Sequence, residues 1–483
     1  MLVKRSIGLA IVVFWCVMNF FFIRRQFDAP PPVITLSGTE RITENIEEWW
    51  GVYYRGDKIG YATQTISPRA NGYKLSDRSV LNLNLLGTIQ PTTTRLEMEA
   101  DDEWILEKFD FELRSREIYF HARGAVEGAR LSLEIHSGGY TSKRDLNLTQ
   151  APYLLAALKP YVVTQQLETG KELMFSTFDP STLSQQVTTV VIEGRERIRV
   201  GGRLEPAIRL RQSVRGISVV SWIDGHGRTL KEESAAGLSL LRQTAQAARD
   251  LPGRAMALDI VAQTAIPLAA PIQDPQAKNA IRFKLTGVDL ENFPLHGGRQ
   301  RLADNRLDIR LEDLKRLNVP DIPVRETRLA SYLQPTAFLQ TDHPAIQTLA
   351  AKIVGGETNG YRAAVKIKDW VYREIAKEPT VSIPNALEVL RTRRGDCNEH
   401  TVLFNALARA AGIPAKTVVG VVYLRGAFYY HAWSEVWLGE WVSLDSVLNQ
   451  FPADVSHIKF LEGEIDSQIE LLQLIGNLKV EVL

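Results

Sequence analysis

The chain has 483 residues, more than one hydrophobic core normally accommodates, so we expect roughly two to four domains. Hydrophobic residues make up 45% and charged residues 23%, which is typical of a folded protein and excludes a disordered chain. The net charge is +1, with no basic excess, so we expect no nucleic-acid partner. The two cysteines, Cys16 and Cys397, lie in an apolar run and in a polar turn, and we expect no structural disulfide.

The N-terminal segment predicts a membrane anchor. Residues 6–23 are mostly apolar, with cationic pairs at positions 4–5 and 24–25, and their length is at the short end for a spanning helix. No small-residue cleavage site follows, so residues 1–30 are interpreted as an uncleaved transmembrane signal anchor; a buried soluble helix is the alternative. We expect a single-pass protein of the inner (cytoplasmic) membrane, with the bulk of the chain periplasmic or extracytoplasmic.

Residues 31–250 predict an antiparallel β-rich domain. Short runs of alternating hydrophobic and polar residues recur along it, for example at 79–85 and 94–100. Their close spacing indicates a meandering sheet, and segments 151–162 and 237–249 are predicted as helices that cover one face. No catalytic group of residues stands out here, so we expect a scaffold or recognition module.

Residues 251–335 contain eight prolines and predict a connecting β subdomain with a strand pair at 281–285 and 306–310. Residues 336–483 are predicted to form the last domain. Its expected elements are helices near 344–353, 358–376 and 384–392, a buried strand at 417–424 and a tail helix at 466–475.

Cys397 is predicted at the first position of a helix. Asp396 is a suitable N-cap, and Glu399 stands where a capping box requires an acid. The helix is expected to end before Gly412, with Pro414 just beyond. The positive end of the helix dipole favours a thiolate, the nucleophilic form of cysteine, so this position suits a catalytic cysteine.

A histidine and an aspartate follow in a predicted β-hairpin. If residues 438–440 form its loop, Trp437 faces Trp441, and Asp445 becomes the diagonal neighbour of His431. Period 2 places both side chains on the same face of the sheet. The order Cys397, His431, Asp445 supplies a nucleophile, a base and a residue that orients the base.

The chain resembles the transglutaminase-like superfamily in five stretches: GDC at 395–397, EHT at 399–401, ARAAGIPA at 408–415, HAWSE at 431–435 and LD at 444–445. The resemblance implies a papain-like fold over roughly residues 340–455. It also implies that Cys397 is the nucleophile, His431 the general base and then acid, and Asp445 the residue that orients the imidazole. Members include peptidases, amidases and acyl-transferring enzymes. No acidic loop cluster resembles the calcium sites of the animal cross-linking enzymes, so calcium activation is not expected.

Each of these residues has a plainer interpretation. A lone cysteine is usually a small buried hydrophobe, and His431 can be a core histidine of an aromatic strand. His400 lies three residues after Cys397, and together with His431 and Asp445 they would complete a four-ligand zinc site. A further set of aromatic residues is expected either to line a substrate cleft or to belong to the core: Trp433, Trp437 and Trp441.

We therefore predict an α+β fold: an N-terminal transmembrane helix, an antiparallel β-rich domain and a C-terminal papain-like, transglutaminase-like domain. The predicted function is that of a membrane-anchored cysteine enzyme that cleaves or transfers an amide or peptide acyl group through a thioester, with hydrolysis favoured. The expected partners are a peptide or protein substrate in the cell envelope and the membrane itself; no cofactor or metal is expected. The alternatives are a non-catalytic envelope binding or assembly scaffold, and a β-rich domain that binds a lipid or peptide.

Overall fold

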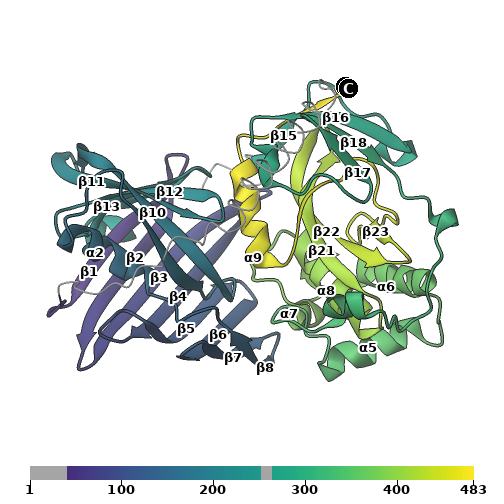
Figure 1. Ribbon diagram of the computed structural model, residues 1–483, viewed down its shortest axis with the longest axis horizontal. Helices are drawn as coiled ribbons and strands as arrows, with labels where there is room; N and C mark the ends of the chain where they lie inside the picture. Colours follow the sequence, from purple (N-terminus) through teal and green to yellow (C-terminus); the bar gives the residue numbers. More distant parts are fainter. Residues whose placement is uncertain (1–40, 252–263) are drawn as a thin grey trace, which may run out of the picture.

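The computed structural model describes residues 41–251 and 264–483 of the chain. Strands hold 47% of the residues and helices 20%. The strands form one 14-stranded antiparallel sheet and several smaller sheets (Figure 1). The predicted α+β fold class that began with a transmembrane helix is therefore wrong. Antiparallel sheets dominate the architecture, because the alternating runs pair with one another along most of the described chain.

No helix within residues 41–251 and 264–483 is long and apolar enough to cross a membrane. The longest helix described, α6 (Gly360–Glu374), has 15 residues and would extend about 22 Å, less than the roughly 30 Å of a bilayer core. This finding corrects the predicted single-pass inner-membrane localisation. The segment on which that prediction was based, residues 6–23, lies outside the described residues.

The large sheet is an antiparallel meander that runs from β8 to β1 and continues from β14 to β9. The first strand therefore pairs with the last one at the middle of the sheet. The strands are β1 (Ile46–Tyr54), β2 (Asp57–Arg69), β3 (Gly72–Leu85), β4 (Thr88–Ala100), β5 (Leu106–Ser115), β6 (Ile118–Glu127), β7 (Arg130–Ser137), β8 (Tyr140–Asn147), β9 (Glu172–Asp179), β10 (Ser184–Val200), β11 (Arg203–Val214), β12 (Ile217–Ile223), β13 (Thr229–Ser234) and β14 (Leu238–Arg242).

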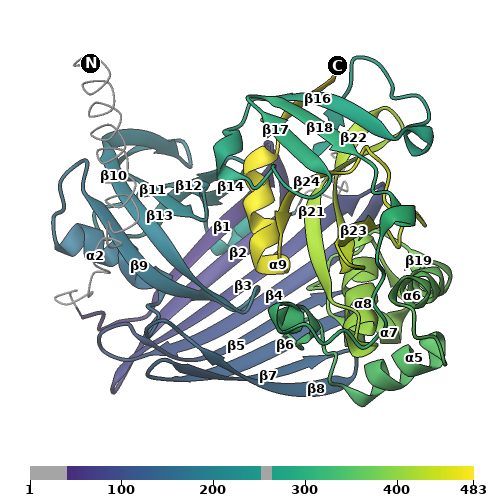
Figure 2. The ribbon, with the colours of Figure 1, turned by 45° about the vertical axis from the view of Figure 1, so that its right-hand side comes forward.

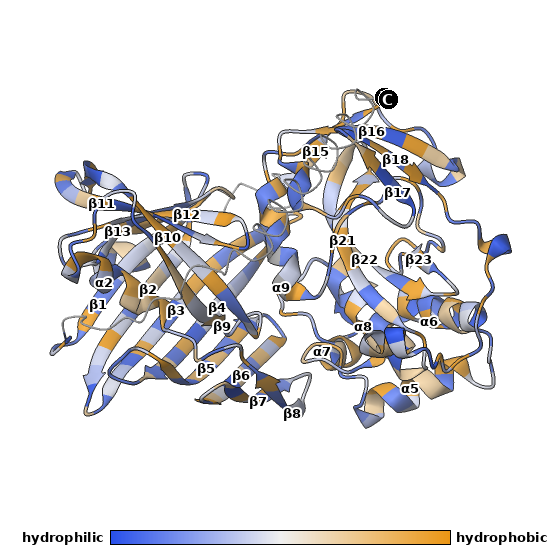
Figure 3. Cartoon of the chain, in the orientation of Figure 1, coloured by the Kyte–Doolittle hydropathy of each residue, from blue (hydrophilic) through white to orange (hydrophobic). Residues whose placement is uncertain are grey.

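The two halves of this sheet face each other across a shared hydrophobic core (Figure 1). Phe109 of β5 packs against Phe178 of β9, with ring centroids 5.2 Å apart. The short helices η1 (Leu155–Ala157) and α2 (Leu158–Thr164) lie on the chain between β8 and β9 and contribute to the same core. Figure 3 shows hydrophobic and hydrophilic bands along these strands, as expected when one face is buried.

The segment predicted as a helix over 237–249 is mostly not helical. β14 (Leu238–Arg242) occupies its first part, and only α3 (Ala245–Arg249) is a helix. β14 pairs with β1 on one side and with β13 on the other. Two ladders of backbone hydrogen bonds, one of them to a strand far away in the sequence, outweigh the local helix preference.

The C-terminal part contains a five-stranded sheet in the order β15-β22-β21-β24, with β23 on β22, and a four-stranded sheet in the order β17-β18-β16-β25 (Figure 2). Helix α8 packs against β21 and β22 on one side and against α5, α6 and α7 on the other. The strands are β15 (Ile266–Pro267), β16 (Ala280–Thr286), β17 (Gln300–Ala303), β18 (Arg306–Arg310), β19 (Ala376–Lys377), β20 (Arg394–Gly395), β21 (Ala415–Leu424), β22 (Ala427–Trp437), β23 (Trp441–Leu444), β24 (Ile458–Glu462) and β25 (Lys479–Val482). The remaining helices are α5 (Pro344–Val354), α7 (Ala386–Thr392), α8 (Cys397–Ala410), α9 (Ile465–Gln468), η2 (Pro275–Ala277), η3 (Leu290–Asn292), η4 (Leu314–Arg316), η5 (Thr327–Leu333) and η6 (Ile469–Leu474).

Candidate active site

Cys397 is the first residue of helix α8, as its flanking residues predicted. The capping box is present: the Asp396 carboxylate accepts from the N–H of Asn398 at 3.1 Å, and Glu399 accepts from the N–H of Asp396 at 2.9 Å. Gly395 precedes the cap with φ of 156°. These local hydrogen bonds fix the orientation in which the cysteine leaves the turn.

The electrostatic surroundings of Cys397 differ from those expected at a helix N-terminus. The side chain is half-buried. Burial, followed by the charge of Asp396, raises the pKa of the Cys397 thiol well above its ordinary value, although a hydrogen bond from the backbone of Ala432 opposes this shift. We conclude that the resting group is a thiol, because burial outweighs the helix dipole here.

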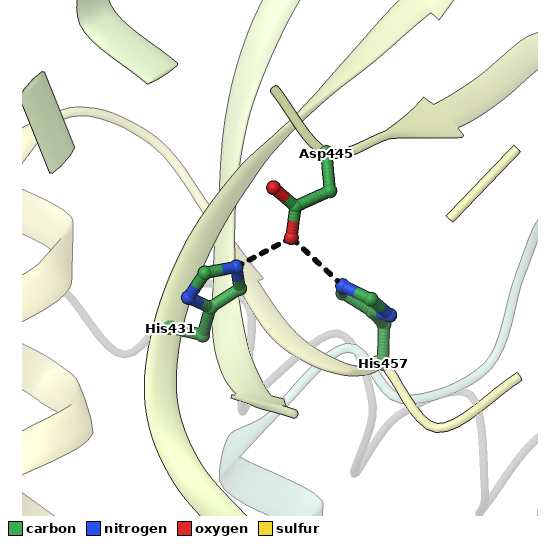
Figure 4. Close-up of side chains that lie close together, drawn as sticks. All are labelled: His431, Asp445 and His457. Atoms are coloured by element: carbon green, nitrogen blue, oxygen red, sulfur yellow. Dashed lines mark hydrogen bonds and ion pairs between the residues drawn. The ribbon is translucent and has the colours of Figure 1, made fainter. Parts of the chain in front are cut away.

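The hairpin that carries the histidine has the predicted register. Trp437 of β22 faces Trp441 of β23, and Ser434 faces Leu444. Asp445 follows the last paired residue, and its carboxylate Oδ2 accepts a hydrogen bond from His431 Nε2 at 2.6 Å (Figure 4). The structure therefore brings together the histidine and the aspartate that the sequence paired.

Helix α8 reaches this hairpin through its first turns. Thr401 Oγ1 donates to the carbonyl of Ala432 at 3.1 Å, and the backbone of Ala432 hydrogen-bonds the Cys397 sulfur. The cysteine thus lies beside the residue that follows His431. His431 Nδ1 makes no hydrogen bond to any residue in the described ranges, so this nitrogen remains available on the ring.

A second histidine, His457, contacts the same aspartate and was missed by the sequence analysis. Its Nε2 donates to Asp445 Oδ2 at 3.1 Å (Figure 4). Its Nδ1 lies 3.3 Å from Asp454 Oδ1. His457 is buried, at 1% exposed. The spacing of Asp454 and His457 indicates only a local contact, and no periodic pattern connects either residue with Asp445.

Electrostatic interactions stabilise the cluster of His431, Asp445 and His457. Burial opposes ionisation of Asp445, but the neighbouring His431 and His457 hold its pKa well below the ordinary value. Burial likewise opposes protonation of His457, whereas hydrogen bonds to Asp445 and Asp454 raise its pKa above the usual range. We conclude that Asp445 is an anion that accepts from two imidazoles, an arrangement that compensates its desolvation.

The ligand-capable atoms of His431, Asp445 and His457 lie within 4.8 Å of one another, close enough for a metal ion. The Nε2 atoms of His431 and His457 both donate hydrogen bonds to Asp445, so neither offers a lone pair to a metal ion. His400 is not part of this group: its Nδ1 donates to the carbonyl of Asp396 at 2.7 Å. The four-ligand zinc site considered from the sequence is therefore not assembled.

The three tryptophans of the hairpin pack in two separate clusters: Trp433 lies beside His431, whereas Trp437 and Trp441 pack with Val324 and Leu329. Trp433 is 2% exposed and stacks on His431, with centroids 6.1 Å apart. Trp437 and Trp441 contact each other edge to face at 5.6 Å. Trp433 therefore supports the imidazole from one side and restricts its orientation.

Cys397 at the start of a helix, His431 on the adjacent strand and Asp445 hydrogen-bonded to His431 follow the order of groups that the resemblance to a papain-like domain implies. The predicted resemblance is confirmed, because residues 347–446 match the family model of the transglutaminase-like superfamily. This range includes Cys397, His431 and Asp445 and ends before His457. The C-terminal part of the chain is thus a transglutaminase-like domain, of a family of cysteine-type enzymes.

The chain is similar to an uncharacterized protein of Haemophilus influenzae, with 28% identity over 179 residues that cover 30% of this chain and 47% of the relative. It therefore spans less than half the length of that relative. A solved structure of a proposed cysteine protease from Cytophaga hutchinsonii shares 19% identity and covers 42% of this chain and 83% of its own, with a TM-score of 0.30. A proposed protease from Parabacteroides distasonis shares 13% identity over 68% of this chain and 64% of its own, with a TM-score of 0.20.

Proposed function

We propose that the transglutaminase-like domain is a cysteine hydrolase of amide or peptide bonds. Cys397 is the nucleophile, His431 the general base and then acid, and Asp445 the residue that orients His431. The observation that carries this proposal is the 2.6 Å hydrogen bond from His431 Nε2 to Asp445. Because Nε2 holds the ring proton in this bond, Nδ1 carries a free lone pair that can accept the thiol proton.

The reaction begins from the thiol, since the pKa of Cys397 is raised at rest. As the sulfur attacks the substrate carbonyl carbon, its proton moves to His431 Nδ1. The C–N bond then breaks, the amine leaves with that proton, and a thioester remains on Cys397. Water attacks the thioester, His431 accepts the water proton and returns it to the sulfur, and the carboxylic acid product leaves.

The oxyanion of each tetrahedral intermediate requires donors near Cys397. The amides of Asn398, Glu399 and His400 are engaged by Asp396 through the cap and the first helical hydrogen bond. The N–H of Cys397 has no acceptor among the described residues and is our candidate donor. Hydrolysis is preferred to acyl transfer, because no residue of the site indicates a binding position for an amine acceptor.

The test is turnover of a panel of peptide amides with fluorogenic leaving groups by the full chain carrying Cys16→Ser, so that Cys397 is the sole thiol. We expect activity that Cys397→Ala abolishes and that His431→Ala lowers at least 100-fold. Alkylation by iodoacetamide, followed against pH, reports the thiol directly and should slow in His431→Ala. Amine incorporation from added glycinamide above hydrolysis would instead favour a transferase.

The alternative function, a non-catalytic binding or assembly scaffold, predicts the opposite results. A non-catalytic domain would show no turnover above the Cys397→Ala variant, and its alkylation rate would be indifferent to His431→Ala. Cys397→Ser serves as the control for packing, because it keeps a side chain of similar size with a far weaker nucleophile.

A further inference from the structure

A cavity of about 550 Å³ lies between the two halves of the large sheet. Its volume is within the range of small-molecule sites. Cys397, His431 and Asp445 do not line it, so it is separate from the candidate active site. Its lining has an apolar end and an acidic end, where Glu48 and Asp77 lie; two cationic residues, Lys159 and Arg228, also line the cavity.

The apolar end consists of core side chains from both halves of the sheet. They come from β2 to β5 on one side and from β9 on the other, and include Ile66, Leu75, Met98, Leu106 and Phe178. A hydrocarbon or aromatic group placed here would lose its contact with water, at a gain of about 0.8 kcal/mol per methylene.

The acidic end is set by the register of three adjacent strands. Glu48 of β1 faces Gln64 of β2, and Gln64 faces Asp77 of β3, so all three side chains lie in one row. Two strand spacings place the backbones of Glu48 and Asp77 about 10 Å apart. The row continues to Leu96 of β4, where the apolar lining begins.

The two carboxylates of this row are incompletely satisfied. Glu48 is 7% exposed, and its Oε1 makes no hydrogen bond to any residue in the described ranges; the same holds for Oδ1 of Asp77. Lys159, which lines the same cavity, already donates to Glu232 at 2.5 Å and to Thr229 at 2.8 Å. Buried carboxylate oxygens without partners are costly, and a cation with N–H donors would compensate them.

We propose that this cavity binds a small amphipathic organic cation, with its aliphatic or aromatic body at the apolar end and an ammonium or guanidinium head between Glu48 and Asp77. An anionic amphiphile is disfavoured, because it would approach two carboxylates, whereas Lys159 and Arg228 of the same lining already pair with Glu232 and Asp224. A neutral one would leave both carboxylates without a charged partner.

Protonation of the two acids supports this assignment. Burial raises the pKa of Glu48 to about 7 and that of Asp77 to about 6. A bound cation favours the ionised carboxylates, so binding should release protons and strengthen as the pH rises through 6 to 7. The other groups that act on these two acids are Gln64, Lys159, Asp224, Arg228 and Arg242.

The C-terminal segment forms part of the wall. Leu472 of η6 lines the cavity, and Gln473 donates to the carbonyl of Arg215 at 2.9 Å. Figures 1 and 2 both show this segment, with α9, standing between the large sheet and the C-terminal sheets. A ligand in the cavity should therefore slow amide exchange around η6.

The test is calorimetry of the full chain with n-alkylammonium ions of four to ten carbons, which serve as probes. We expect one site, affinity that increases about fourfold per methylene, and proton release between pH 6 and 7. Alkanoates and alkanols of equal length should bind at least tenfold more weakly. Methylammonium should not bind measurably, because it has no apolar body.

Two variants locate the site. Glu48→Gln with Asp77→Asn keeps the shapes of both side chains and should weaken octylammonium at least tenfold. Glu47→Gln is the matched control, because this exposed acid is the neighbour of Glu48 on the same strand and does not line the cavity. Equal binding of octylammonium and octanoate, an unchanged affinity in the double variant, or no saturable binding would each overturn the proposal.

Discussion

A single carboxylate oxygen, Asp445 Oδ2, accepts hydrogen bonds from both His431 and His457. The other oxygen, Oδ1, accepts from the backbone of Val447 at 2.7 Å and of Leu448 at 2.9 Å. With four donors, this carboxylate cannot rotate without losing several hydrogen bonds. His457 therefore acts on His431 through Asp445, and we regard it as a positioning residue.

We expect His457→Leu to lower kcat roughly tenfold with little change in KM. The reason is that Asp445 would lose one charged donor, a bond of about 1.5–3 kcal/mol, and would hold the imidazole of His431 less firmly. His457→Gln retains an N–H donor and should recover part of the rate. Steady-state kinetics of both variants measures this, and a KM effect without a kcat effect would contradict the positioning role.

The pH dependence of stability follows from the raised pKa of His457. A group whose pKa is higher in the folded state contributes stability that is complete below its unfolded pKa of about 6.5 and is lost as the pH rises through the folded value. We expect the loss of unfolding free energy in His457→Gln to be largest near pH 6 and to diminish toward pH 9. Urea unfolding at several pH values, with the exposed His296→Gln as control, measures it; a difference that grows with pH would contradict the assignment.

At the scale of elements, the turn between α7 and α8, residues 393–396, depends on close packing between Gly395 and Glu399; we call it the nucleophile turn after the proposed role of Cys397. A Cβ at Gly395 would overlap the Cβ and Cγ atoms of Glu399, the acid of the capping box. We expect Gly395→Ala to displace this acid, to lower the unfolding free energy by roughly 1–3 kcal/mol and to reduce turnover. Thermal unfolding and kinetics measure both effects.

Gly426→Ala is the matched control for this prediction. Gly426 also has positive φ, of 99°, but a Cβ there would meet nothing within 4 Å. Its substitution introduces backbone strain without a collision, and it lies in the turn between β21 and β22. Equal losses of stability in the two variants would show that strain alone, and not the contact with Glu399, explains the effect.

Elements with local signals were predicted from the sequence, and those that depend on distant partners were not. The start of α8 follows from Asp396 and Glu399, and the register of β22 and β23 follows from a three-residue loop at 438–440. β14 was missed because its partner β1 lies almost two hundred residues earlier. His457 was missed because the irregular segment after Asp445 carries no periodicity that would reveal its direction.

At the scale of the whole molecule, the large sheet holds the segment that leads to Cys397. Glu388 of α7 accepts from Ser137 Oγ at 3.2 Å and from the N–H of Gly138, at the turn between β7 and β8. Asn385 donates to Ser137 Oγ at 2.7 Å. Nothing in the sequence indicated these contacts, because about 250 residues separate the partners and neither side is periodic.

Gln90 of β4 makes a second connection of this kind. It is 2% exposed, its amide group donates to the carbonyl of Pro379, and its oxygen accepts from the N–H of Val381 at 3.2 Å. The segment it holds continues to Ser382, which donates to Glu399 of the capping box. Gln90 therefore holds residues 379–381, and the next residue, Ser382, connects this segment to the capping box of the nucleophile turn.

We expect Gln90→Ala to accelerate amide exchange in residues 376–396 and to lower kcat. The reason is that the carbonyl of Pro379 and the N–H of Val381 both lose their hydrogen-bond partner. Gln185→Ala is the matched control: this side chain makes a comparable set of hydrogen bonds, to Ser176 of β9 and to Thr149 and Gln150 just after β8, none of them to the C-terminal part of the chain. It should change stability without changing exchange in 376–396. If both variants altered exchange there equally, the effect would arise from general destabilisation of the sheet, whereas a response confined to Gln90→Ala would show that the sheet positions the nucleophile turn.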